Sequence, residues 1–132
     1  DLAGFAVGAV ERAQRLMPDQ ARPGDIVLGL ASSGVHSNGY SLVRKIVQDA
    51  GINLAAPCAF AAGQSWGEVL MTPTRIYVRS VRAALAAAPG GVRALAHITG
   101  SGLPGNAART IPDTLALAID AASWQLPPVF DW

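Results

Sequence analysis

The pattern of apolar and polar residues along the chain predicts short strands that alternate with amphipathic helices. Strands are predicted where short apolar runs lie between turn residues, at 2–10, 25–31, 92–98 and 115–120. Helices are predicted where apolar residues recur every three or four positions, at 39–50, 72–88 and, more briefly, 104–109, and another is expected to open at Pro127-Pro128. This alternation indicates an α/β or α+β layer protein, and it does not set the order of the strands.

The central unit of this pattern consists of an apolar run, a polar loop and an amphipathic helix. The apolar run Asp25–Ala31 leads into the loop 32–39, which has the sequence Ser-Ser-Gly-Val-His-Ser-Asn-Gly. The helix that follows has Ser37 or Asn38 as its expected N-cap and Gly51 just past its end. We therefore expect the loop to join a buried strand to a helix N-terminus.

Such a loop is typical of an anion site, because first-turn N–H groups have no partner within the helix and lie at the positive end of its dipole. Gly34 and Gly39 allow backbone to approach a ligand closely, and His36 can donate a hydrogen bond or carry charge. The loop has neither the Gly-x-Gly-x-x-Gly nor the Gly-Lys-Ser/Thr nucleotide pattern. An ordinary capped turn, in which Ser and Asn only satisfy the helix end, is the alternative.

Other candidate residues lie further along the chain. The helix at 72–88 is expected to begin with Thr72 as N-cap and Pro73 at its first position, which places Arg75 in the first turn against the helix dipole. Arg75 therefore either holds an anionic ligand or a carboxylate, or points into water. The segment 99–106 forms a second Gly-rich turn that enters a helix. His97 is expected to be a core or edge histidine of its strand.

The long segment Ile52–Trp66 has no sustained period and is a candidate lid. Within it Cys58 is expected to be an inert filler, because no basic residue or His adjoins it to lower its thiol pKa.

Composition narrows the class of protein. A chain of 132 residues fits one domain, and its net charge of +1 argues against a nucleic-acid partner. A single cysteine excludes an internal disulfide and a Cys-based metal cluster. With one cysteine the cytosol is the expected compartment. No apolar stretch reaches the roughly 18 residues of a membrane span, so no transmembrane helix is expected, and the printed sequence does not open with a basic-then-apolar pattern.

Several ordered motifs resemble the phosphoribosylformylglycinamidine cyclo-ligases, also called aminoimidazole ribonucleotide synthetases. They are Ala3-Gly4-Phe5-x-Val7-Gly8-x-Val10-Glu11, Gly24-Asp25, Ser32-Ser33-Gly34-x-His36-Ser37-Asn38-Gly39-Tyr40-Ser41-Leu42-Val43-Arg44, Pro73-Thr74-Arg75-Ile76-Tyr77-Val78 and Ala94-x-Ala96-His97-Ile98-Thr99-Gly100-x-Gly102. The resemblance runs in register along the chain.

This resemblance implies a fold and a domain organisation. Residues 1–132 are expected to be a single, incomplete C-terminal domain, truncated at both ends, in which 1–12 form the first strand after a missing ATP-binding domain. The implied fold is a three-layer α/β/α domain with a mixed sheet, partly like a ferredoxin plait. Members of the family are homodimers built through their amino-terminal domains.

The resemblance also implies an activity. ATP phosphorylates the formamide oxygen of formylglycinamidine ribonucleotide, and the amidine-derived nitrogen then attacks that carbon to close the imidazole ring of purine biosynthesis. ATP and Mg²⁺ are expected to bind mainly in the missing amino-terminal domain, and no metal ligand is assigned to this chain. His36 is the expected catalytic residue, and the expected substrate-binding residues are Ser33, Gly34, Ser37, Asn38, Arg75, Gly100, Gly102 and Asn106.

Two positions depart from the family pattern. Ser101 replaces the middle of three consecutive glycines, and because Ser tolerates a positive φ less well than Gly, close backbone approach is in doubt there. Gly105 stands where Glu is common, so a polar contact that relatives offer is missing. Formylglycinamidine synthase, selenophosphate synthetase, thiamine-phosphate kinase and the hydrogenase-maturation dehydratase share the two-domain architecture. A non-catalytic anion-binding or interaction module is the alternative from another class.

Overall fold

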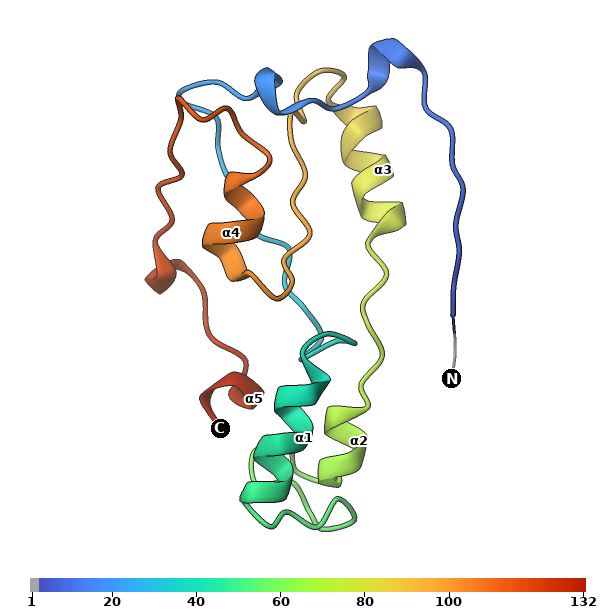
Figure 1. The fold of residues 1–132 in the computed structure, drawn as a ribbon, viewed down its shortest axis with the longest axis vertical. Coiled ribbons are helices and arrows are strands. Elements are labelled where there is room, and N and C mark those ends of the chain that lie inside the picture. The colour runs from blue at the N-terminus through green and yellow to red at the C-terminus, as the bar shows by residue number, and fades with distance from the viewer. Residues whose placement is uncertain (1–2) are drawn as a thin grey trace.

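The computed structural model describes residues 3–132, in which helices are joined by long extended segments (Figure 1). The α-helices are α1 (Tyr40–Asp49), α2 (Trp66–Leu70), α3 (Val78–Ala87), α4 (Gly102–Ala108) and α5 (Pro128–Asp131). Short 3₁₀ helices are η1 (Arg12–Gln14), η2 (Pro18–Gln20) and η3 (Ala121–Ser123). Helices α1 and α2 lie side by side at one end of the molecule, and α3 and α4 lie toward the other (Figure 1). None of these helices has the length and apolar content needed to cross a membrane.

The expected mixed sheet is wrong. Within residues 3–132 the β pairing consists of one isolated antiparallel bridge, between Pro57 and Ser65. The segments predicted as strands at 25–31, 92–98 and 115–120 carry no strand pairing, and neither does the described part of 2–10, whose first residue lies outside the described range. The three-layer α/β/α fold, partly ferredoxin-like, is therefore corrected to helices connected by extended chain.

The physical reason is visible in the segment Asp25–Ala31. An apolar run becomes a strand only when a neighbouring chain satisfies its backbone groups and another layer covers its side chains. Here Ile26 and Leu28 are 86% and 83% exposed, so no layer covers them. The segment is held at its two ends instead, where Arg93 pairs with Asp25 and the carbonyl of Ala31 accepts side-chain hydrogen bonds.

Helix α1 confirms the prediction of a helix at 39–50. Its apolar spacing and the stop at Gly51 have the expected effect, because Gly51 adopts φ +63 just past the end and its N–H donates to the carbonyl of Gln48. The expected N-cap is wrong. The N-cap is Gly39, at φ 72, and neither Ser37 nor Asn38 caps the helix.

The helix predicted at 72–88 begins later than expected. Helix α3 ends at Ala87, close to the predicted end, but its N-cap is Tyr77 rather than Thr72. Residues 72–77 have no regular secondary structure, and hydrogen bonds tie Pro73 and Thr74 to the loop before α1. Tertiary contacts thus override the local Thr-Pro start signal.

Helix α2 was not predicted, although its capping box is present in the sequence. The hydroxyl of Ser65 accepts from the N–H of Glu68, and the Glu68 carboxylate accepts from the N–H of Ser65 at 2.7 Å and from its hydroxyl at 2.9 Å. These bonds from Ser65, the backbone N–H first, lower the pKa of the Glu68 carboxyl from its ordinary value. Helices α4 and α5 confirm the short helices expected near 104–109 and after Pro127.

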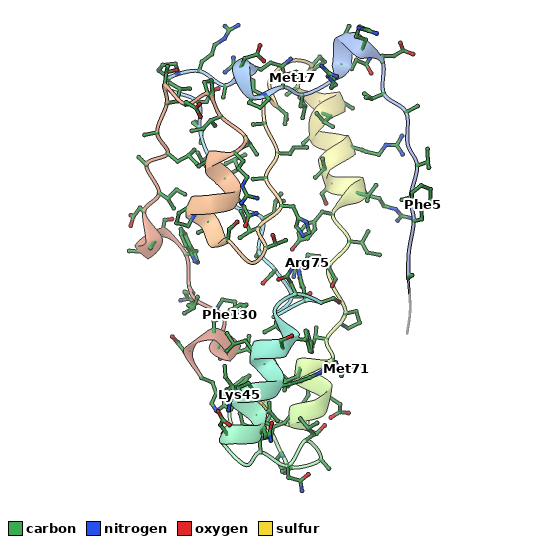
Figure 2. The ribbon with its side chains drawn as sticks, viewed as in Figure 1. Phe5, Met17, Lys45, Met71, Arg75 and Phe130 are labelled. Carbon is green, nitrogen blue, oxygen red and sulfur yellow. The ribbon has the colours of Figure 1, made fainter. Side chains whose placement is uncertain are left out.

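The buried apolar residues are few and most lie near α2. Cys58, Trp66 and Leu70 are buried there, as is Ala107 on α4. Trp66 packs edge-on against Phe60 at 5.2 Å between ring centroids and against Trp132 at 4.5 Å. By contrast, Phe5 is 94% exposed and points away from the helices (Figure 2). His97, expected in a strand core or edge, is exposed.

Candidate ligand-binding site

The loop before α1 and the extended segment before α3 are joined by side-chain hydrogen bonds. The hydroxyl of Ser33 donates to the carbonyl of Pro73 at 2.8 Å, and the hydroxyls of Ser37 and Thr74 lie 3.2 Å apart. These residues are about 40 positions apart in the chain. The structure therefore brings two of the motifs found in the sequence into one place.

Arg75 lies at this junction, near the middle of the molecule (Figure 2). Its Nη1 donates to the carbonyl of Ala31 at 3.0 Å, and the hydroxyl of Tyr77 donates to the same oxygen at 2.9 Å. The ion pairs of the described residues are Lys45–Asp49 and Arg93–Asp25, so Arg75 pairs with no carboxylate there. The guanidinium keeps its charge beside the loop, with further N–H groups able to bind an anion.

His36 is part-buried within the loop and is engaged by backbone donors. Its Nε2 accepts from the N–H of Ser33 at 2.9 Å and from the N–H of Arg75 at 3.4 Å. The imidazole ring lies 6.2 Å from the ring of Tyr77, centroid to centroid. The ring expected to act on substrate thus uses one of its nitrogens inside the protein.

The N-terminus of α1 lacks a side-chain cap. Its N-cap residue, Gly39, makes no side-chain capping bond, so the first-turn N–H groups of this helix have no side-chain acceptor there. Asn38 is exposed, and Gly34, at φ +131, turns the loop while its N–H donates to the Ser32 hydroxyl at 3.4 Å. Because the Ser and Asn side chains do not cap the helix, the capped-turn interpretation loses its main support.

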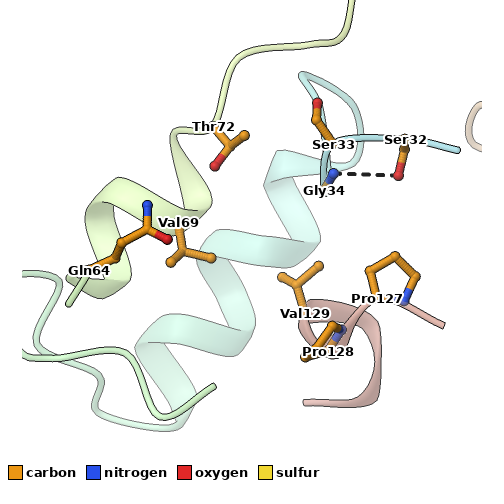
Figure 3. Close-up of a pocket in the computed structure, with 9 residues that line it drawn as sticks. All are labelled: Ser32, Ser33, Gly34, Gln64, Val69, Thr72, Pro127, Pro128 and Val129. Carbon is orange, nitrogen blue, oxygen red and sulfur yellow. Dashed lines mark hydrogen bonds between the residues drawn. The ribbon is translucent and has the colours of Figure 1, made fainter. Parts of the chain in front are cut away.

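A cavity of about 460 Å³ opens beside this loop (Figure 3). Its lining residues come from the loop, from the region around α2 and from the start of α5, and they are Ser32, Ser33, Gly34, Gln64, Val69, Thr72, Pro127, Pro128 and Val129. Of the expected site residues Ser33 and Gly34 line the cavity, beside Ser32 of the same loop. The other expected residues of this loop and its neighbour do not line it, namely His36, Ser37, Asn38 and Arg75. The Pro127-Pro128 pair was recognised as a helix start, but nothing in its pattern indicated that it would face the loop.

The second Gly-rich turn forms a separate place in the structure. Asn106 fixes it, because its Oδ1 accepts from the N–H of Thr99 at 2.9 Å and its Nδ2 donates to the Thr99 hydroxyl at 3.3 Å. Gly102, at φ +65, carries the positive φ, whereas Ser101 lies at φ −88. Ser101 therefore introduces no backbone strain. Gly100, Gly102 and Asn106 do not line the cavity beside the first loop.

The described residues do not fit a metal site. Among residues 3–132 there is no group of three or more His, Cys, Asp or Glu side chains that could hold a metal ion. The donors at the junction are hydroxyl, guanidinium and backbone N–H groups, which suit anions rather than Mg²⁺.

Comparison with known protein families identifies the family to which the chain belongs. The family described as AIR synthase related protein, C-terminal domain, matches residues 22–132, which include the loop before α1, the segment with Arg75 and the turn at Asn106. The family is found in AIR synthase-like ATP-dependent enzymes, including ones linked to purine biosynthesis. The match does not distinguish the cyclo-ligase from its relatives. The chain belongs to the AIR synthase related C-terminal domain family.

Proposed function

We propose that this chain is part of an ATP-dependent cyclo-ligase that converts formylglycinamidine ribonucleotide to aminoimidazole ribonucleotide. The proposal rests on the family membership and on the His-Ser-Asn-Gly-Tyr-Ser sequence at 36–41, which resembles the cyclo-ligases more than their relatives. In the full enzyme an amino-terminal domain supplies the ATP and Mg²⁺ sites, and the enzyme is a homodimer.

The role of this chain in that reaction is to bind and orient the ribonucleotide. The observation that carries this role is the position of the Arg75 guanidinium, beside a loop that leads into a helix N-terminus with no side-chain cap. Among residues 3–132 this guanidinium has no carboxylate partner. Ser33, Gly34, Ser37 and Asn38 lie on that loop. A phosphate there accepts charge-assisted hydrogen bonds from Arg75 and backbone bonds from the first turn of α1.

Gly100, Gly102 and Asn106 have a second role in the proposal. They form a turn at the N-terminal end of α4 that Asn106 holds through two hydrogen bonds to Thr99. We assign this turn to the part of the substrate cleft that faces the amino-terminal domain.

The test uses the full-length enzyme with Arg75→Ala and Arg75→Lys variants. Loss of a charge-assisted phosphate contact predicts a fall in kcat/KM for the ribonucleotide of ~10- to 1,000-fold in Arg75→Ala, with partial recovery in Arg75→Lys. Arg79→Ala is the matched control, because Arg79 lies within α3, whereas Arg75 precedes that helix and donates hydrogen bonds to Ala31 and His36. Unchanged kinetics in Arg75→Ala would exclude this site as the phosphate contact.

A binding module that lacks catalysis makes a different prediction. If the full-length protein binds the ribonucleotide but forms no ADP in its presence, the cyclo-ligase assignment is wrong and the binding role remains.

A further inference from the structure

One atom of His36 connects the two halves of the candidate site. Its Nε2 accepts the N–H of Ser33, within the loop, and the N–H of Arg75, on the facing segment. A ring nitrogen accepts a hydrogen bond only when it carries no proton. The observed arrangement therefore requires a neutral imidazole with its proton on Nδ1, as assigned from these donors.

The backbone of His36 gives independent support for a special role. Its φ of 54 makes it the one non-glycine residue with positive φ among residues 3–132. A side chain in this region is unfavourable, and such a conformation persists where surrounding contacts hold it. The two bonds to Nε2 are among the contacts that hold this loop, together with the bond from Ser33 to Pro73 and the hydroxyl pair of Ser37 and Thr74.

We propose that His36 is a positioning residue that clamps Arg75 to the loop, and that protonation of its ring opens this clamp. The inference deepens the proposed function, on which it rests for the role of Arg75 as the anion contact. When the clamp is closed, the guanidinium of Arg75 is kept on the carbonyl of Ala31 beside the loop.

The direction of the pH dependence follows from the surroundings of the ring. The titratable and charged groups that face His36 are Arg75, which is cationic, and Tyr77, whose hydroxyl donates to Ala31. No described carboxylate forms an ion pair with His36. A protonated ring loses its acceptor and faces a second cation without a counterion. The clamp is therefore closed while the ring is neutral, and it opens when Nε2 gains a proton.

The clamp is tested on this chain by NMR. At pH 8 the ¹⁵N shift of Nε2 should be that of an unprotonated nitrogen, and the amides of Ser33 and Arg75 should be protected from exchange. On lowering the pH to 5 their protection, corrected for intrinsic exchange, should fall roughly tenfold, the scale of one hydrogen bond. The matched control is His97→Gln, which removes the other histidine and should leave this change intact.

Two variants at position 36 complete the experiment. In His36→Gln the amide oxygen accepts hydrogen bonds but does not titrate, so protection should persist without the pH dependence. In His36→Ala the exchange protection of the Ser33 and Arg75 amides should be low at every pH. Equal protection of Ser33 and Arg75 in wild type and His36→Ala, or a pH dependence that survives in His36→Gln, overturns the proposal.

Binding of sulfate, whose charge is constant over this pH range, separates the clamp from the proposed function. A clamp predicts that sulfate affinity falls as the pH drops, whereas a cationic His36 that contacts the anion itself predicts a rise, which overturns the positioning role. If the amides respond as expected but sulfate binds at no pH, the clamp stands and the assignment of the loop as an anion site fails.

Discussion

Gly105 and Ser101 depart from the family pattern together, and the structure predicts that they are energetically coupled. A Cβ placed on Gly105 would lie 2.6 Å from Cβ of Ser101 and 2.9 Å from its hydroxyl oxygen. Carbon atoms in contact prefer about 3.5–4.0 Å, so one of the two side chains must move by about 1 Å. With Ser at position 101, only glycine fits at position 105 without displacement.

The magnitude follows from two opposing effects of Gly105→Ala. Overpacking against Ser101 costs about 1–3 kcal/mol, whereas replacing glycine in a helix gains about 1 kcal/mol. The single variant should therefore lower the free energy of unfolding by about 0–2 kcal/mol. In a Ser101→Gly background the obstructing atoms are gone, and the same change should raise stability by up to about 1 kcal/mol. The coupling energy is the difference, about 1–3 kcal/mol.

Urea unfolding of the four proteins, followed by circular dichroism, measures this coupling directly. Gly4→Ala in the extended N-terminal segment, where an added Cβ meets no atom within 4 Å, is the control for a change that touches nothing. If Gly105→Ala has the same effect in both backgrounds, Ser101 and position 105 do not contact each other and the steric explanation fails.

Three further predictions concern other parts of the chain. The hydrogen bonds from Ser65 lower the pKa of Glu68 in the folded protein from 4.5, so the ionised carboxylate stabilises the fold above that pH. This stabilisation is lost as the pH falls through the folded-state pKa. The free energy of unfolding of Glu68→Gln, measured over the same acid range, should lack that loss. Trp66→Ala should lower the free energy of unfolding by about 3–5 kcal/mol in urea, since Trp66 is buried between two aromatic rings, whereas Trp124→Ala, at a side chain 43% exposed, should cost far less. The purified chain alone should release no ADP from ATP with the ribonucleotide present, since the ATP ligands are expected in the amino-terminal domain; turnover that persists through purification would contradict this.

Local signals predicted the helices better than the extended segments. The spacing of apolar residues and the glycine stop located α1, and the Ser65-x-x-Glu68 box that starts α2 was readable but overlooked. The predicted strands are wrong because an apolar run is buried in a sheet only when another part of the fold covers it. The exposed side chains of Ile26 and Leu28 show that the described chain does not cover this run. Whether a cover forms depends on distant residues, which no local window contains.

Two of the motifs singled out in the sequence lie together in the structure, but the contacts between them could not be predicted from the sequence. The sequence singled out the loop at 32–39 and Arg75, and the structure brings them together. The groups that join them include the backbone carbonyls of Ala31 and Pro73. Every residue has such a carbonyl, so the amino-acid sequence does not indicate which ones accept hydrogen bonds from side chains. Tyr77 was missed for this reason, although it lies in the motif that supplied Arg75.

Cys58 provides a chemical probe for opening of the loop at 52–65. It is the single cysteine of the chain, 7% exposed, and its N–H donates to the carbonyl of Gln64, whose side chain lines the cavity beside Ser33. A thiol reagent reaches such a sulfur only after an opening that exposes it, so the rate of alkylation measures the equilibrium of the openings that expose Cys58. A ligand that fills the cavity should slow alkylation, and the chain thus carries its own kinetic reporter of cavity occupancy.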